Sequence, residues 1–480
     1  ENEARPTNTK AKAKEQALEF LRTTYDFDES QYKQTRDLKT SLDNRDDFSF
    51  AWQHKDVNIP WSDTDDSKSK LITKITLAGN TIVAYSKSVF YTPDSFRRFI
   101  SLQRNTGNNF SSIVRIFDTI LLAAAVFFVV IRRNHLVMHT AKRFYIGTMA
   151  FILGLMIISY INQYELVLHN YDTSVPFSSY LMRSCINYLL AAIVFAVYII
   201  MPSLSGESIC HENNKTRTSD GLLHNLRSTF LSRNVSQRIL VGYFAFFIML
   251  GLQALITAIG QKYWNVWVEH SWMEDSSTAY LPFIAAFIVG FKASVSEELL
   301  YRLFTINWIK KISGSLIVAV LISSLIWGFA HSHYAVFPSW FRGVEVSILG
   351  VFLAIIYLRF GLISVLVAHY VFDVFWSSAA YLFGTSSTFN FVSCLIVLLL
   401  PFIFAVITWF TNKKELCKTM QWKLNKHQQY NQEVLTHYLN DHWDKYASMA
   451  HNDFIKEITN HGWDMAVVEE AVKHLKKQQH

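Results

Sequence analysis

The chain has 480 residues, of which 51% are hydrophobic, 15% aromatic and only 17% charged, a balance that argues against a soluble protein and favours one largely embedded in a membrane. Its formal net charge of +7 does not indicate a nucleic-acid partner, because the basic residues are not gathered into a stripe with interleaved aromatic residues. The chain opens at Glu1 without an apolar segment, so we expect a preceding start, signal peptide or anchor to have been removed.

Residues 1–112 are predicted to form a small α+β domain outside the cytoplasm. The apolar positions between Lys10 and Tyr25 fall on one side of a helix. Residues 71–77 and 81–85 have the composition of two strands, and they flank a short turn that contains Gly79. Nothing in this domain indicates chemistry.

About nine apolar segments follow, each near the roughly 20 residues that a helix needs to span a membrane. They predict an all-α polytopic membrane protein with about eight to nine transmembrane helices. We divide this part into accessory helices with a cytosolic loop (113–238) and a core (239–410) that carries the polar motifs described below. The segments are 113–131, 144–161, 180–201, 239–259, 279–309, 316–331, 341–358, 362–380 and 390–410.

Basic residues fall on one side of the membrane if the segments alternate, and the positive-inside rule makes that side cytosolic. The N-terminal domain is then extracytoplasmic, and residues 411–480 form a cytosolic tail that we predict to be helical. We expect the cell membrane of a prokaryote, and we leave the oligomeric state open. The basic residues are Arg132, Arg133, Lys142, Arg143, Lys215, Arg217, Arg227, Arg233, Lys310, Lys311, Arg359, Lys413 and Lys414.

Two adjacent carboxylates interrupt the apolar segment 279–309. Placing a charged side chain in the bilayer interior costs about 3 kcal/mol or more of free energy, so such residues usually face the interior of a helix bundle and serve a function. Read as a helix, Glu298 and Arg302 are four residues apart and can pair, whereas Glu297 points about 100° away. We therefore expect Glu298 and Arg302 to form a structural pair and Glu297 to be available for chemistry.

Two later segments carry further polar groups. Counted along each helix at 1.5 Å per residue, Glu297 lies roughly 20 Å and His331 roughly 22 Å deep in the membrane. By the same count His369 and Asp373, which share a helix face, lie at roughly 12 and 18 Å. Three helices therefore bring two carboxylates and two imidazoles to a similar depth, the kind of convergence that an active site needs.

Absent motifs narrow the chemistry. The sequence contains no HExxH zinc-protease motif, no Gly-x-Ser-x-Gly elbow and no phosphate-binding glycine loop. A glutamate and a histidine without an obvious nucleophile suit the activation of water. Three alternatives stay open: a zinc site made by Glu297, His331 and His369, an ion-coupled transporter that uses the same groups as a relay, and a non-enzymatic immunity or scaffold protein.

Three motifs in this order on successive membrane helices resemble those of the CAAX protease and bacteriocin-processing (CPBP, or Abi) family of intramembrane glutamate-type proteases. The resemblance covers about residues 239–410, and relatives in eukaryotes and archaea are the Ras-converting CAAX endopeptidases. The motifs are Glu297-Glu298-x-x-x-Arg302, Trp327-x-x-x-His331 and His369-x-x-x-Asp373.

The resemblance implies that Glu297 and His331 activate the attacking water, that His369 and Asp373 stabilise the oxyanion, and that the second glutamate and the arginine support the site. It implies hydrolysis of a membrane-proximal, CAAX-like peptide segment without a cofactor. The chain departs from the usual pattern at Trp327, where phenylalanine is usual, and at Asp373, where many members have asparagine.

Overall fold

The structure, a computed structural model, consists of two compact units, formed by residues 1–109 with 164–188 and by residues 110–163 with 189–480. Each is described by itself. The described residues are 5–25, 27–62, 65–91, 94–132, 138–172, 175–213, 233–269, 279–384, 387–411, 424, 426–446 and 449–478.

The N-terminal part of the first unit is a four-stranded antiparallel sheet, in the order β1-β2-β3-β4, with one helix packed on it. The predicted helix is confirmed, and Ala13, Ala17 and Leu21 are fully buried against the sheet. Two of the strands were not predicted, although the alternation of Phe48, Phe50 and other apolar residues marks the core-facing side of one of them. The elements are α1 (Lys10–Tyr25), a short 3₁₀ turn (Glu29–Gln31), β1 (Tyr32–Ser41), β2 (Asp46–Ser62), β3 (Asp65–Ala78) and β4 (Thr81–Tyr91).

The predicted turn between β3 and β4 is confirmed at Gly79. This residue has a φ of +63°, which glycine adopts at no steric cost. Its N–H donates to the carbonyl of Asp46 at 2.9 Å, so the turn is also tied to the start of β2.

The rest of the described chain is mostly helical, and all nine predicted apolar segments lie in helices. Seven helices in the described ranges are long and apolar enough to cross a membrane, which fits a membrane protein. The helices of this part of the chain, the short ones included, are α2 (Asp94–Ile131), α3 (Met138–Asn162), α4 (Tyr164–His169), α5 (Phe177–Asn213), α7 (Arg233–Trp264), α9 (Pro282–Glu297), α10 (Asn307–Ser313), α11 (Leu316–Ala330), α12 (Ser339–Phe360), α13 (Leu362–Phe383) and α14 (Thr388–Thr411).

Two of the nine predicted segments do not form a single long helix: 279–309 contains three consecutive helical elements, and 316–331 corresponds to the shorter helix α11. Segment 279–309 comprises α9, a π-helix (Glu298–Ile306) and α10, which follow one another without a break. Gly314 ends α10 with a φ of 70°, and its N–H donates to the carbonyl of Lys310. The hydroxyl of Ser315 then accepts from the N–H of Val318 and caps the start of α11. This tight connection returns the chain antiparallel, so α11 packs along the π-helix.

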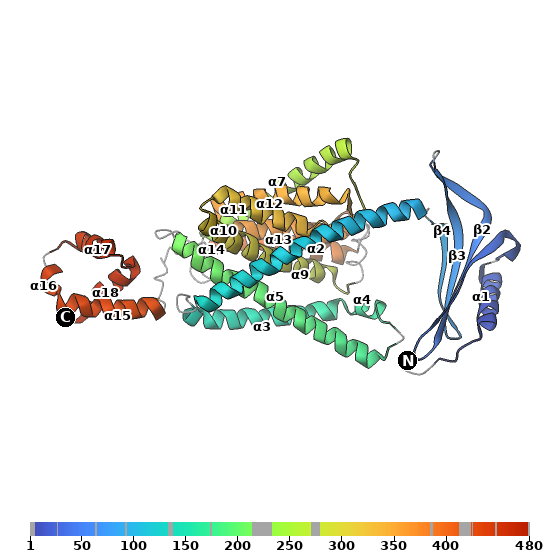
Figure 1. Ribbon diagram of the computed structural model, residues 1–480, viewed down its shortest axis with the longest axis horizontal. Coiled ribbons are helices and arrows are strands. Elements are labelled where there is room, and N and C mark those ends of the chain that lie inside the picture. The colour runs from blue at the N-terminus through green and yellow to red at the C-terminus, as the bar shows by residue number, and fades with distance from the viewer. Residues whose placement is uncertain are drawn as a thin grey trace. The chain divides into compact units, whose positions relative to one another are not determined.

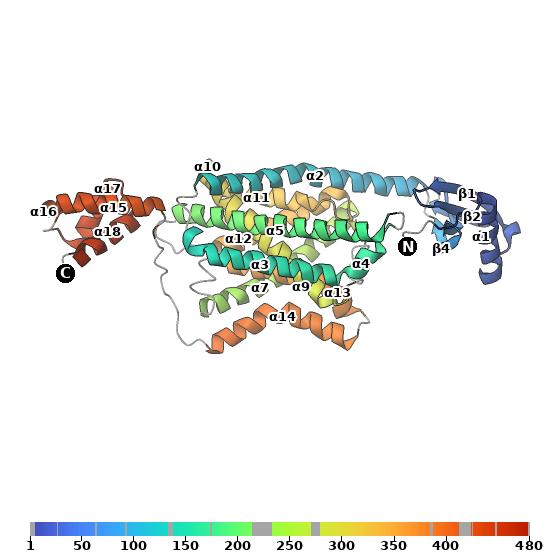
Figure 2. The ribbon, with the colours of Figure 1, turned by 90° about the horizontal axis from the view of Figure 1, so that it is seen from below.

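Helices α9, α11, α12 and α13 pack together in the middle of the helical bundle (Figures 1 and 2). Helices α11 and α12 approach each other closely at Gly328, where an added Cβ would lie 2.1 Å from the Ser347 hydroxyl oxygen. A short pair of strands, β5 (Trp267–Val268) and β6 (Val336–Phe337), follows the ends of α7 and α11. The glycine contact therefore fixes how the end of α11 lies beside α12.

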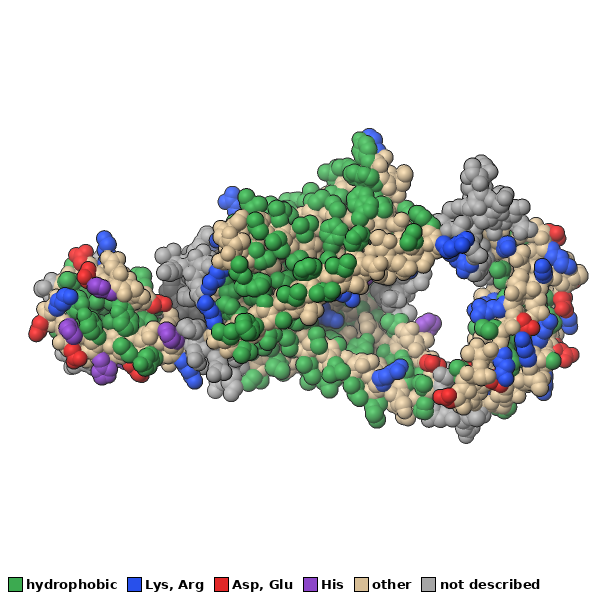
Figure 3. All heavy atoms as spheres, in the orientation of Figure 1, with side chains coloured by type: hydrophobic (Ala, Val, Ile, Leu, Met, Phe, Trp, Pro, Cys, Tyr) green, Lys and Arg blue, Asp and Glu red, His purple; other side chains and the backbone are tan. Residues whose placement is uncertain are grey.

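Apolar side chains cover much of the visible face of the helical bundle (Figure 3). Exposed examples on α2 are Ile113, Ile116 and Ile120, each more than half exposed, as expected for helices surrounded by lipid rather than water. Several basic residues used to predict the sidedness lie outside the described residues. These are Arg133, Lys215, Arg217, Arg227, Lys413 and Lys414.

The C-terminal tail is helical where it is described, as predicted. Phe454, Val467 and Val468 contribute to a small core of its own, and Trp463 packs against that core. Trp422, another apolar residue of the predicted tail, lies outside the described residues. The helices are α15 (Lys426–Asp441), α16 (Trp443–Tyr446), α17 (His451–Asn460) and α18 (Met465–Gln478).

Candidate active site

The two adjacent glutamates stand where α9 changes into the π-helix. Glu297 is the last residue of α9 and Glu298 the first of the π-helix. The widened turn is visible in a side-chain bond, because the hydroxyl of Thr305 donates to the carbonyl of Leu300, five residues back, at 2.8 Å. Asn307 follows, and its amide donates to the Tyr357 hydroxyl of α12 at 2.9 Å. Such π-helical turns occur frequently at functional sites.

The predicted pair of Glu298 and Arg302 is present and fully buried. Arg302 Nη1 donates to Glu298 Oε1 at 3.0 Å, and the two side chains are 0% and 1% exposed. The guanidinium carbon also lies 4.2 Å from the centre of the Trp327 ring, a cation–π geometry. Arg302 therefore connects the π-helix to α11.

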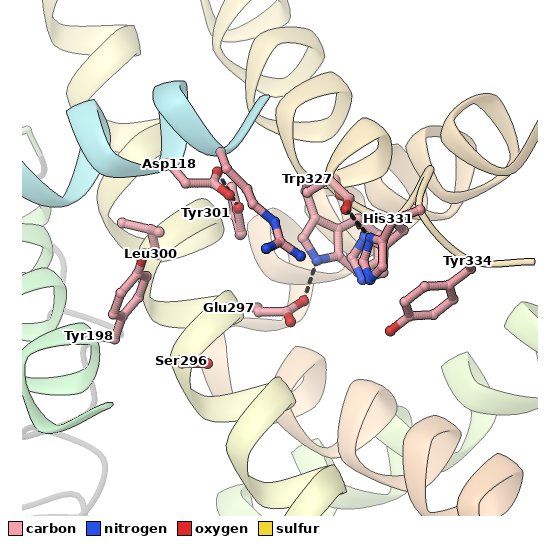
Figure 4. Close-up of a pocket in the computed structure, with 12 residues that line it drawn as sticks. Asp118, Tyr198, Ser296, Glu297, Leu300, Tyr301, Trp327, His331 and Tyr334 are labelled. Atoms are coloured by element: carbon pink, nitrogen blue, oxygen red, sulfur yellow. Dashed lines mark hydrogen bonds between the residues drawn. The ribbon is translucent and has the colours of Figure 1, made fainter. Parts of the chain in front are cut away.

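Glu297 has different surroundings. Its Oε2 atom accepts a hydrogen bond from the indole nitrogen of Trp327, and the same oxygen lies 3.9 Å from His369 Nε2. Its side chain is 27% exposed, whereas that of Glu298 is fully buried. Figure 4 shows Glu297 with its hydrogen bond to Trp327. The expectation that only one carboxylate is held by Arg302 agrees with this geometry.

His369 on α13 joins the two glutamates to Asp373. Its Nδ1 atom lies 2.6 Å from Glu298 Oε1, and its Nε2 atom lies 3.3 Å from Asp373 Oδ2. A carboxylate paired with an arginine can only accept, so His369 Nδ1 carries the hydrogen in this contact. Three helices thus meet as predicted, and the imidazole is oriented by Glu298.

His331 lies just beyond the last residue of α11, with φ −90° and ψ 0°, a backbone region where many active-site residues are found. Its Nδ1 atom is 2.8 Å from the carbonyl oxygen of Trp327. Because a carbonyl only accepts, Nδ1 donates, and Nε2 is the acceptor nitrogen of the neutral ring. This nitrogen is suited to accept a hydrogen bond from water.

Glu297 and His331 line one cavity of about 250 Å³. This is smaller than the roughly 300–1,000 Å³ of pockets for drug-sized ligands, and it suits a short stretch of a larger molecule. His369 and Asp373 are not among the described residues that line it; they lie against the glutamates instead. The lining residues are Arg115, Asp118, Tyr198, Ser296, Glu297, Leu300, Tyr301, Trp327, Ala330, His331, His333 and Tyr334.

Comparison with known proteins bears directly on this arrangement. Residues 279–375 match the family model of the type II CAAX prenyl endopeptidase Rce1-like proteins, a range that contains Glu297, His331, His369 and Asp373. The predicted CPBP resemblance is confirmed for this part of the chain.

A curated bacterial protein matches part of the chain. Over 86 residues the chain is 34% identical to the sporulation-killing factor biosynthesis protein SkfC of Bacillus subtilis (strain 168), a stretch that covers 18% of this chain and 17% of that protein. The chain thus matches about a sixth of the length of this curated relative. No solved structure matches the chain.

The cavity wall opposite the family segment was not predicted from the sequence. Asp118 of α2 accepts a hydrogen bond from the Tyr301 hydroxyl at 2.5 Å, and Arg115 of the same helix also lines the cavity. The available signal was the presence of two charged residues in the otherwise apolar stretch 113–131. Neither residue falls within the range matched by the family model.

Within the described ranges, no group of three or more His, Cys, Asp or Glu side chains is arranged to hold a metal ion. Both ring nitrogens of His369 already contact carboxylates. The zinc arrangement considered from the sequence, which uses Glu297, His331 and His369 as ligands, would require His369 to release one of these contacts.

Proposed function

We propose that this chain is an intramembrane endopeptidase that hydrolyses a peptide bond with a water molecule activated by Glu297 and His331. The observation that carries the proposal is that these two side chains, both in the family-matched segment, line one cavity, with Glu297 held by the Trp327 indole and left outside the buried pair. The family match supports CAAX-type protease chemistry.

The proposed reaction needs no covalent intermediate with the protein. Glu297 accepts a proton from water while His331 Nε2 accepts the second hydrogen bond and orients it. The water oxygen bonds to the carbonyl carbon, and the negative charge develops on the carbonyl oxygen. When the C–N bond breaks, Glu297 returns the proton to the departing amine.

His369 and Asp373 are proposed to serve the oxyanion side. Because Nδ1 of His369 faces Glu298, Nε2 is the nitrogen that would donate to the developing negative charge, turning its hydrogen from Asp373 toward the substrate oxygen. Asp373, 3.3 Å from that nitrogen, would stabilise the protonated ring and keep it oriented. Glu298 and Arg302 hold this arrangement without touching substrate.

The proposed substrate is a peptide or protein segment at the membrane, and the family match favours a lipidated, CAAX-like segment. We place the protein in the cell membrane of a prokaryote, with the N-terminal domain outside and the C-terminus in the cytosol. The orientation is tested by introducing a cysteine into each terminal region of the protein in turn and treating intact cells with a thiol reagent that does not cross the membrane. A cysteine in the N-terminal domain should be labelled and one in the C-terminal tail should not. Labelling at the C-terminus alone would contradict it.

The activity is tested by comparing the membrane proteome and peptidome of cells that carry the intact protein or Glu297→Ala. New protein termini should appear with the intact protein and be lost in Glu297→Ala and His331→Ala, at equal expression. Exposed residues of α4 supply matched controls, Glu165→Ala and His169→Ala, which should retain cleavage. Full activity in either site variant would overturn the assignment.

Two further experiments separate the protease from a scaffold, an immunity factor or a transporter, none of which the comparisons favour. A cellular phenotype that survives in Glu297→Gln would favour a scaffold or immunity role. Proton flux without substrate in reconstituted vesicles would favour transport. For the protease we expect both to be absent.

A further inference from the structure

One face of α2 remains polar where the helix enters its apolar stretch, residues 113–131. Ser111, Arg115 and Asp118 are spaced at i, i+4 and i+7 and therefore share a helix face. Neighbours such as Ile116 and Ile120 are 60% and 52% exposed on the outside of the bundle. On the polar face Ser111 is buried, Asp118 is half-buried and Arg115 is exposed, and the latter two line the cavity beside Glu297.

Both ends of this face are fixed by hydrogen bonds. The Ser111 hydroxyl donates to the carbonyl of Ala330 at 2.8 Å and lies 3.3 Å from His333 Nδ1. Two turns further on, Asp118 accepts from the Tyr301 hydroxyl. Helix α2 is therefore attached to the loop after α11 at one point and to the π-helix at the other, and Arg115 lies between them.

Arg115 itself makes no side-chain hydrogen bond or ion pair with any described residue. The carboxylate of Asp118, three residues on, is engaged by Tyr301, and Glu298 is engaged by Arg302. A guanidinium presents five N–H donors in a planar fork that matches a carboxylate. In an apolar helix such a group is costly, and it commonly marks a pathway or a site.

We propose that Arg115 binds a carboxylate of the peptide substrate, either the C-terminal carboxylate or that of an aspartate or glutamate side chain. This inference rests on the proposed protease function and adds a determinant of substrate choice to it. The cavity of about 250 Å³ holds only a short stretch of peptide beside Glu297, so the carboxylate belongs within a few residues of the cleaved bond. The determinant lies on α2, outside the family-matched range 279–375.

The test uses the full chain in proteoliposomes and a mixture of short synthetic peptides in four forms. Each peptide carries a free C-terminal carboxylate or a C-terminal amide, with or without an internal Asp or Glu. Mass spectrometry identifies the products, and KM and kcat are then measured for the best peptide and its amidated or Asn/Gln-substituted analogue. The variants are Arg115→Gln, Arg115→Lys and, as a control at the residue directly after the same helix, Arg132→Gln.

We expect the wild type to prefer one carboxylate form, and the form preferred identifies the source of the carboxylate. Arg115→Gln should raise KM for that form by about tenfold or more, since it removes charge-assisted hydrogen bonds to the carboxylate, and should remove the preference over the neutral analogue. Arg115→Lys should restore part of the preference, because lysine keeps the charge without the fork. Arg132→Gln should keep it in full.

Failure of this inference is distinguishable from failure of the proposed function. Wild-type protein that cleaves acidic and neutral forms with equal KM would overturn the carboxylate site and leave the protease intact. An unchanged preference in Arg115→Gln, with the variant as stable as the wild type in thermal unfolding, would do the same. Absence of cleavage of every form by the wild type, matching Glu297→Ala, would overturn both.

Discussion

His369 Nδ1 lies 2.6 Å from Glu298 Oε1, the same carboxylate oxygen that Arg302 approaches at 3.0 Å. One buried oxygen therefore joins the π-helix to α13 and orients the imidazole that faces Glu297. The second glutamate of the motif stabilises the site through its neighbours, and removing it should affect folding as well as activity.

Glu298→Ala should destabilise the protein by about 3–5 kcal/mol, because it leaves the buried guanidinium of Arg302 without its counter-charge. Unfolding of the purified protein in mixed micelles, followed by tryptophan fluorescence, measures the change. Glu470→Ala removes a partner from the exposed pair with Lys473 and should cost no more than about 1 kcal/mol. Equal stability of the two variants would contradict this role for Glu298.

Trp327→Phe removes the indole N–H that donates to Glu297 and some buried ring volume, but it keeps an aromatic ring beside Arg302. The variant should fold and remain active, with a cleavage rate lowered by up to about tenfold, the size expected for one hydrogen bond to a charged group. The rate on a single peptide substrate measures it, and Trp340→Phe, a partly exposed tryptophan of α12, is the control. A complete loss of activity would show that the indole has a further role.

The contact between α2 and the π-helix is measurable as a coupling energy. Tyr301→Phe, Asp118→Ala and the double variant form a thermodynamic cycle around the 2.5 Å hydrogen bond. We expect the two substitutions to be non-additive by about 1–3 kcal/mol. Additive effects on the free energy of unfolding would mean that this bond does not hold the two helices together.

Chelation separates the water mechanism from a zinc site. We expect cleavage to persist after treatment with EDTA or phenanthroline, because His369 has both ring nitrogens against carboxylates and ligation would require breaking one of these contacts. Metal analysis of the purified protein accompanies the assay. One equivalent of zinc, with activity lost on chelation and restored by zinc, would favour the metal alternative.

Much of the site follows from helical spacing, because groups four residues apart share a face. That reasoning predicted the pair of Glu298 and Arg302, and depth counting brought His369 and Asp373 to the same layer. It could not predict the π-helical turn at Glu298, since a hydrogen-bond pattern shifted by one residue leaves no mark in composition. Nor could it show which nitrogen of His369 faces which carboxylate.

The missed elements have a different cause. Strand β1 is mostly exposed, so it has no alternation of apolar and polar residues to detect, and its pairing with β2 depends on contacts between strands. The polar face of α2 was not predicted, because Arg115 and Asp118 line the cavity only as a result of the packing of α2 against other helices. Long-range packing, which one sequence does not encode in any local pattern, decided both.

Glu297 and Asn307 stand at opposite ends of the π-helix in one unbroken helical rod. In an α-helix each residue turns the chain by about 100°, so deleting a single residue between them would rotate Glu297 away from Trp327 while Asn307 stayed bonded to Tyr357. A deletion placed after Arg302 would leave all three motifs unchanged and alter the hydrophobicity little. When relatives are aligned, the number of residues between Glu297 and Asn307 is therefore as informative as their identity. A gap placed there means that the two side chains point in different relative directions around the helix axis.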